Sequence, residues 1–145
     1  MVSTSRPELL RQRTKRFALR VVNLFQSLPN NEVMRTLGRQ LLRSGTSVAA
    51  NYRAVCRARS KAEFIAKLGV VLEEADETAF WLELLTEAKV VPKPRLESLL
   101  AETNELVRIF AASRQTAQRQ SRDSSKRRAE VRKANRPITQ SLNRE

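Results

Sequence analysis

The chain has 145 residues, a length typical of one domain, and a composition with 3 Gly and 5 Pro that favours helices over sheets. No apolar run approaches the roughly 20 residues that cross a bilayer, and Met1–Pro7 lacks the hydrophobic core of a signal peptide, so we expect a soluble cytoplasmic protein. The absence of histidine removes imidazole catalysis, and the lone Cys56 excludes an intrachain disulfide or a cysteine-based zinc site and is expected to be buried.

The formal net charge of +13 is unevenly distributed along the chain. Residues 1–61 carry 13 basic and 2 acidic side chains, residues 62–113 carry 5 and 10, and residues 114–145 carry 10 and 3. A chain with basic ends and an acidic middle either binds a polyanion such as nucleic acid or neutralises itself by packing one part against another.

The first predicted helix runs from about Arg6 to Leu28. Ser5 and Glu8 form an S-x-x-E capping box, with Pro7 in the first turn, which is typical of a helix start. Apolar residues then recur every three to four positions, which predicts one buried face. Taken singly, the basic residues off this face are most simply a solvated surface. Together they are candidates for phosphate contact, and those we select are Arg11, Lys15 and Arg16.

The second predicted helix begins near Asn31 or Glu32, because Pro29-Asn30-Asn31 supplies a turn and an N-cap. Gly38 and Gly45 lower its helix propensity, which predicts that another backbone packs closely there. Asn51 is expected to be a buried amide bonded to a neighbouring helix. At about 100° per residue, the aliphatic residues fall on one side of this helix and the arginines on the other. The arginines, which we expect to face solvent or an anionic partner, are Arg35, Arg39, Arg43, Arg53 and Arg57.

A second S-x-x-E box, Ser60 with Glu63, predicts the start of a third helix directly after Arg59, which is a further candidate for phosphate contact. This helix is apolar on more than one face, most of all from Ala79 to Leu85, and one small bundle has too little core to cover it. The sequence leaves open whether the fourth helix and the preceding hinge cover it within one subunit. We expect an oligomer interface instead, formed by Val70, Phe80, Trp81, Leu84 and Leu85.

A Val-Pro-Lys-Pro segment at 91–94 interrupts the helical pattern, and a fourth amphipathic helix is predicted to end at about Gln118. Four helices with short connections predict an all-α, antiparallel up-and-down four-helix bundle over residues 1–118. Residues 119–145 lack an apolar stripe, so we expect a basic C-terminal tail that is disordered or partly helical. The tail either stays solvated or contacts phosphates through Lys126, Arg127, Arg128, Arg132 and Lys133.

Several segments of the chain are similar to those of a known protein family. They are R-F-A at 16–18, Q-L-L-R-S-G-T-S-V-A-A-N-Y at 40–52, R-A-R-S-K-A-E-F-I-A-K-L at 57–68, and E-E-A-D-E-T-A-F-W-L-E-L-L at 73–85. Together they make the stretch 16–91 resemble the four-helix bundle family named for the intervening sequences of bacterial large-subunit ribosomal RNA genes.

That resemblance implies an up-and-down four-helix subunit, commonly assembled as a homopentamer. It also implies kinship with the accessory protein of diversity-generating retroelements, which works with a reverse transcriptase and nucleic acid. The family's signature in the second helix is close to N-I-A-E-G, whereas this chain reads N-Y-R-A-V from Asn51. The amide is kept, but no role that depends on the glutamate carries over.

The sequence gives no sign of an enzyme. It has neither a glycine-rich phosphate loop nor a nucleophile motif, and the acidic run at 73–77 points around its helix instead of converging on a cation. We therefore expect no catalytic site, no metal and no cofactor.

Two functions from different classes remain. A nucleic-acid-binding oligomer would contact RNA or DNA phosphates in a sequence-tolerant, salt-sensitive way. A protein scaffold would instead pair the basic helices of one subunit with acidic residues of the next.

Overall fold

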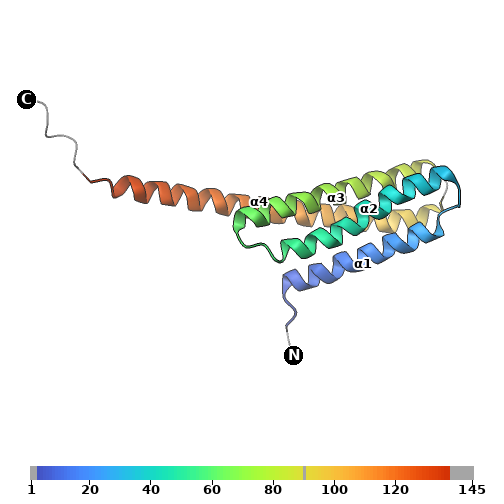
Figure 1. The fold of residues 1–145 in the computed structure, drawn as a ribbon, viewed down its shortest axis with the longest axis horizontal. Coiled ribbons are helices and arrows are strands. Elements are labelled where there is room, and N and C mark those ends of the chain that lie inside the picture. The colour runs from blue at the N-terminus through green and yellow to red at the C-terminus, as the bar shows by residue number, and fades with distance from the viewer. Residues whose placement is uncertain (1–2, 90, 138–145) are drawn as a thin grey trace, which may run out of the picture.

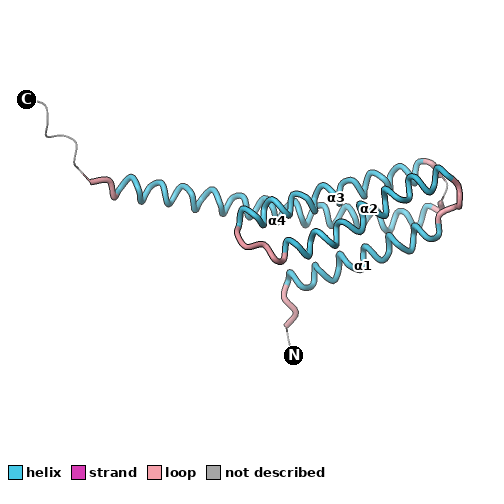
Figure 2. Tube along the Cα trace, viewed as in Figure 1, coloured by secondary structure: helices cyan, strands magenta, loops and turns pink. Residues whose placement is uncertain are grey.

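The computed structural model describes residues 3–89 and 91–137, and these residues form an antiparallel up-and-down bundle of helices (Figure 1, Figure 2). The helix α2 packs against α1 and α3, α3 packs against α4, and α1 meets α4 over a much shorter seam. The predicted all-α four-helix bundle is confirmed. The helices are α1 (Arg6–Ser27), α2 (Glu32–Val55), α3 (Lys61–Glu87) and α4 (Lys93–Ala134).

Three of the helices begin at side-chain caps that the sequence predicts. The Ser5 hydroxyl accepts a hydrogen bond from the Glu8 backbone N–H at 3.4 Å, and the Ser60 hydroxyl accepts one from the Glu63 N–H at 3.0 Å. At the start of α2, the Asn31 side chain accepts from the Met34 N–H at 2.9 Å. Each cap satisfies a backbone donor that has no partner inside its own helix.

The core lies along the axis of the bundle and receives apolar side chains from all four helices. Close packing at Gly38 and Gly45 is observed, but against side chains and not against another backbone: a Cβ at Gly45 would lie 2.8 Å from the Val21 side chain, and a Cβ at Gly38 would lie 2.8 Å from the Leu28 side chain. These glycines therefore let α2 approach α1 closely. The largest fully buried side chains include Phe17, Leu41, Leu68, Leu82, Leu85, Leu96, Leu106 and Phe110.

Two expectations about single residues in α2 are wrong. Cys56 is exposed, because it caps the C-terminal end of α2 one residue after Val55, which is buried in the core. The amide of Asn51 is half-buried and donates at 2.9 Å to the Ser47 carbonyl of its own helix, not to a neighbouring helix.

The prediction that the fourth helix ends at about Gln118 is wrong. The helix α4 continues to Ala134, beyond the end of the bundle (Figure 1). Its last buried side chain is Ala117, and every residue from 122 to 134 is exposed. We call residues 122–134 the arm. The sequence holds neither glycine nor proline between Pro94 and Pro137, so no helix-breaking residue interrupts α4, which ends at Ala134, shortly before Pro137. Residues 138–145 of the predicted tail lie outside the described residues.

Candidate nucleic-acid interface

The solvent face of α2 carries a row of arginines opposite its buried aliphatic residues. Arg35, Arg39 and Arg53 are exposed, as is Arg57 just beyond the helix, whereas Leu41 and Val48 on the other side are fully buried. The predicted separation of basic and apolar faces is thus confirmed. At about 1.5 Å per residue, the row from Arg35 to Arg53 is roughly 27 Å long. Among the described residues, none of these four arginines forms a salt bridge.

Arg43 differs from the rest of the row because it binds carboxylates of α3. Its guanidinium lies 3.5 Å from the Glu74 carboxylate and also pairs with Glu77, which accepts a further hydrogen bond from the indole N–H of Trp81 at 3.2 Å. The Arg43 guanidinium and, less strongly, the Trp81 indole lower the pKa of Glu77. Arg43 therefore links α2 to α3 and has much of its charge neutralised.

Basic residues of α1 and α2 meet in a shallow groove of about 380 Å³ between the two helices. Arg11 and Lys15 approach it from α1 and Arg53 from α2, and Ala49 and Ala50 also line it. Arg53 is far from Arg11 and Lys15 in sequence, and the fold brings it next to them. Glu8 also lines the groove and pairs with Arg11 at 2.8 Å. The remaining α1 candidate, Arg16, is exposed outside this groove.

Arg13 ties α1 to α4, a role that the sequence does not reveal. Its guanidinium lies 2.7 Å from Glu102 and 3.0 Å from Glu105. The hydrogen bond from Arg13 is the main reason why the pKa of Glu102 is lowered. The partners are 89 positions apart, so no local pattern in the sequence signals the pair.

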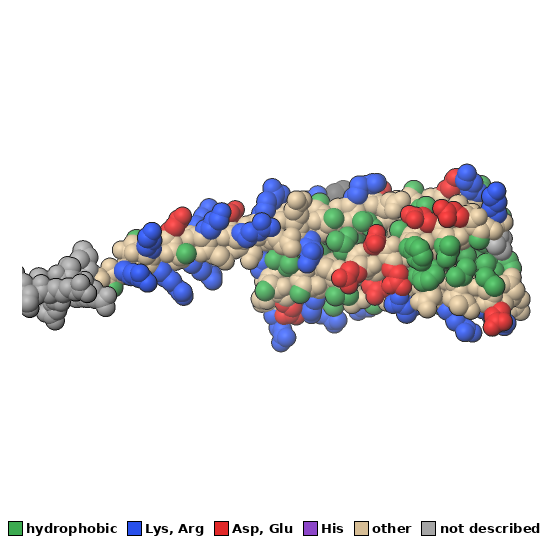
Figure 3. Space-filling model, turned by 90° about the horizontal axis from the view of Figure 1, so that it is seen from above, with side chains coloured by type: hydrophobic (Ala, Val, Ile, Leu, Met, Phe, Trp, Pro, Cys, Tyr) green, Lys and Arg blue, Asp and Glu red, His purple; other side chains and the backbone are tan. Residues whose placement is uncertain are grey.

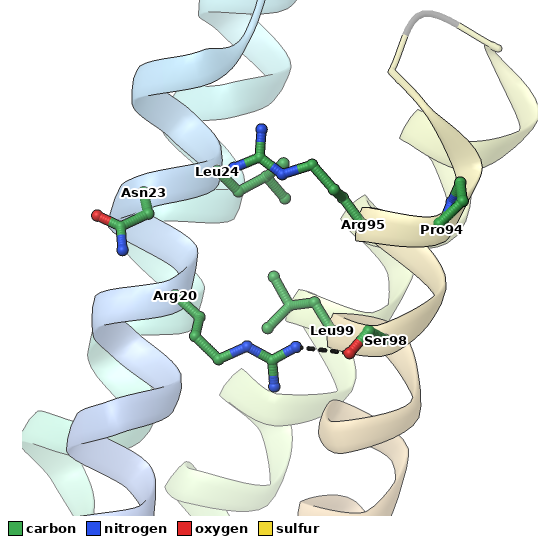
Figure 4. Close-up of a pocket in the computed structure, with 7 residues that line it drawn as sticks. All are labelled: Arg20, Asn23, Leu24, Pro94, Arg95, Ser98 and Leu99. Atoms are coloured by element: carbon green, nitrogen blue, oxygen red, sulfur yellow. Dashed lines mark hydrogen bonds between the residues drawn. The ribbon is translucent and has the colours of Figure 1, made fainter.

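A second basic hollow, of about 430 Å³, lies where α1 meets the start of α4 (Figure 4). Arg20 reaches across from α1 and donates to the Ser98 hydroxyl at 2.9 Å, and Arg95 projects from α4 toward the same space. Leu24 and Leu99 form its apolar wall. The sequence does not single out Arg20 or Arg95, because the loose seam between α1 and α4 that creates the hollow leaves no periodic signal.

Further basic residues surround the point where the arm leaves the bundle. Arg57 and Arg59 are exposed in the α2–α3 connection, and Arg59 lies 3.5 Å from the Glu63 carboxylate. Next to them, the Lys61 ammonium donates to the Gln120 side chain of α4. This contact fixes the connection beside the root of the arm. The basic candidates on the arm, all exposed, are Lys126, Arg127, Arg128, Arg132 and Lys133.

The predicted oligomer face is exposed in part. Phe80 is 52% exposed and Val70 42%, while Trp81 and Leu84 are half-buried. Phe80 and Trp81 form an edge-to-face pair with ring centroids 4.9 Å apart. Leu85 is fully buried in the core of its own chain, so the prediction that it joins this face is wrong, because it has no surface to offer a second subunit.

Neither α4 nor the α2–α3 connection covers Phe80. The alternative in which the fourth helix and the hinge cover this face within one subunit is therefore wrong for Phe80. We call Val70, Phe80, Trp81 and Leu84 the α3 apolar patch. In Figure 3, hydrophobic and acidic side chains gather near the end of the bundle that is remote from the arm, while basic side chains line the arm.

Two further properties bear on the function. Within the described residues, no group of three or more His, Cys, Asp or Glu side chains is placed to hold a metal ion. None of the helices described is both long and apolar enough to span a membrane.

The fold and the exposed cations define the class of protein: a small helical bundle with basic surfaces on α1, α2 and an extended α4. The sequence model of the 23S rRNA-intervening sequence protein family matches residues 9–112, and the chain belongs to this family. The match ends before the arm.

A solved structure from Bacteroides thetaiotaomicron supports the same relationship. It is described as a protein of unknown function from the S23 ribosomal protein family, and it is 37% identical to this chain with a TM-score of 0.66. The alignment covers 70% of this chain and 94% of that one. No curated protein matches the chain.

Proposed function

We propose that this protein is a non-enzymatic, oligomeric nucleic-acid-binding protein that contacts RNA or DNA through backbone phosphates. The observation that carries the proposal is the set of exposed α2 arginines Arg35, Arg39 and Arg53, which form no salt bridge among the described residues. A row about 27 Å long offers cations on the scale over which a duplex presents many phosphates. The basic groove of Arg11, Lys15 and Arg53 widens the same surface toward α1.

Such binding should be tolerant of sequence. Arginines and lysines neutralise phosphates whatever the bases, whereas base readout needs a more varied set of donors and acceptors placed in a groove. Affinity should fall steeply with salt, because each neutralised phosphate releases condensed counterions.

The oligomeric part of the proposal is supported by the α3 apolar patch. Phe80 and Val70 stay exposed in a single subunit, and burying them against a second copy would remove apolar surface from water. The family resemblance favours a homopentamer. It also makes a reverse transcriptase a partner to test, and a cytoplasmic location accords with this role.

The scaffold alternative receives less support. It pairs basic helices of one subunit with acidic residues of the next, yet Arg13 and Arg43 already bind carboxylates of their own chain. The α2 arginines that form no salt bridge within residues 3–89 and 91–137 are better placed for an external polyanion.

The test is a mobility-shift titration of the full chain with RNA and DNA over a salt series from about 50 to about 300 mM. The double variant Arg39→Gln, Arg53→Gln should weaken binding and reduce the slope of log K against log salt by about 2. The matched control, Lys67→Gln with Lys93→Gln, removes the same charge from lysines that pair with Glu63 and Glu97, and it should leave the slope nearly unchanged. Absence of binding by the unmodified chain below about 0.1 M salt would refute the proposal.

A further inference from the structure

The side of α4 that faces the core changes its chemistry where the bundle ends. Within the bundle this side is buried and carries Leu96, Leu99, Thr103, Leu106, Phe110 and Ala117. At about 100° per residue, the same side continues beyond Ala117 as Ser121, Ser124, Arg128 and Arg132. Ser121 is half-buried and the other three are exposed. We call these four residues the inner face of the extended helix.

The carboxylates of the arm lie on its opposite side. Asp123 and Glu130 fall roughly 130° to 150° from the core-facing direction, on the same side as Arg119. The inner face therefore presents guanidinium and hydroxyl groups without an acidic neighbour on the arm. The outer face mixes both signs of charge, which weakens its field toward an anion.

The inner face meets the end of the bundle at a corner. The contact of Lys61 with Gln120 places the α2–α3 connection, with Arg57 and Arg59, at the root of the arm. Figure 1 shows the arm leaving the bundle at the end where this connection lies. Arg128 and Arg132 lie about 12 and 18 Å along the helix from Gln120. These offsets from the residue that Lys61 contacts are comparable to the width of a nucleic-acid groove, about 12 Å for the major groove of DNA.

We infer that this corner docks the backbone of double-stranded nucleic acid, with Arg57 and Arg59 on one wall and Arg128 and Arg132 on the other. The inference rests on the proposed function and assigns it a site and a ligand class. Serines between the two walls allow a phosphate backbone to approach closely and donate hydrogen bonds to it.

One observation favours a duplex, and a second places the arm outside the family match. Residues 111–137 contain no aromatic side chain, so the arm offers no platform on which single-stranded bases stack. The family match ends at residue 112, so the arm wall of the corner lies outside it.

The experiment compares two arginine pairs on opposite sides of the same helix in the full-length chain. Arg128→Gln with Arg132→Gln alters the inner face, and Arg119→Gln with Arg122→Gln removes the same charge from the outer face. Both variants keep helix-forming residues, and circular dichroism should report unchanged helix content. Binding is measured for a 30-base-pair duplex and for one of its strands alone, over a salt series.

We expect the inner variant to bind the duplex at least about tenfold more weakly near 0.1 M salt, with the slope of log K against log salt reduced by about 2. The outer variant should lose less than about threefold in duplex affinity. Adding Arg57→Gln to the inner variant should then have a smaller effect than Arg57→Gln alone, because the two walls hold one ligand.

Equal losses of duplex affinity in the inner and outer variants would refute the corner as the docking site. They would leave the proposed function standing, since diffuse charge would then explain binding. Tighter binding of the single strand than of the duplex would overturn the ligand class. Failure of the unmodified chain to bind any nucleic acid would overturn both the proposed function and this inference.

Discussion

Arg13 is held between two carboxylates of α4, and this arrangement makes the stability of the bundle depend on pH. The pKa of Glu102 lies below its ordinary value of 4.5 because Arg13 donates to it, with smaller contributions from Arg20 and Arg16. Its pKa is therefore lower in the folded chain than in the unfolded one. The pair stabilises the fold fully above the unfolded pKa, and this contribution is lost as the pH falls through the folded pKa.

Replacement of Arg13 by Gln should lower the free energy of unfolding by about 0.5–1 kcal/mol at neutral pH, because both side chains remain partly exposed. The difference between the two proteins should shrink as the pH drops below about 4.5, which urea unfolding across the acid range measures. Arg35→Gln is the control, since Arg35 is exposed and has no salt bridge among the described residues. A difference that stays constant with pH would contradict this assignment.

At the level of helices, the approach of α1 to α2 depends on Gly45, whereas Gly69 on α3 faces only a flexible side chain. A Cβ at Gly45 would lie 2.8 Å from both methyl carbons of Val21, which is fully buried and has no room to move. A Cβ at Gly69 would lie 3.2 Å or more from the guanidinium of Arg114, which can shift.

Both Gly→Ala substitutions gain the same helix propensity, so that term cancels when they are compared. Gly45→Ala should therefore be less stable than Gly69→Ala by about 1–3 kcal/mol, the usual range for an overpacked core. Urea unfolding of the two variants tests this. Equal stabilities would show that α1 can move away from α2 at no cost.

Helix starts were predictable because capping is local. Ser5, Asn31 and Ser60 each act within three residues of their position, and the structure places all three as caps. The end of α4 was not predictable from an apolar stripe, because a helix continues wherever its residues permit, even after its buried face is lost. Apolar periodicity also failed for Leu85, since a helix with several apolar rows does not reveal which row faces the core.

The candidate site was predictable only in part. The basic face of α2 follows from helical spacing alone and is observed as expected. The pairing of Arg43 with α3, the pairing of Arg13 with α4 and the hollow at Arg20 all depend on residues that are distant in sequence. Such contacts are set by how helices pack, which spacing within one helix does not contain.

Side chains are unevenly distributed along the molecule as a whole: on the face seen in Figure 3, basic side chains line the arm and hydrophobic side chains gather toward the other end of the bundle. Phe80→Ser should reduce self-association with little effect on folding, because the side chain is 52% exposed. Light scattering measures the change in mass. Leu19→Ser, at a residue of α1 that is 55% exposed, is the matched control and should leave the mass unchanged. A strictly monomeric unmodified chain would refute the oligomer.

The exposed thiol of Cys56 gives this molecule a chemical handle. It is the single cysteine of the chain and lies in the connection between α2 and α3, one residue from Arg57. A maleimide dye would therefore attach at one defined position, beside the root of the arm. Its fluorescence anisotropy and quenching would follow events at that end of the bundle in real time, without any engineered mutation.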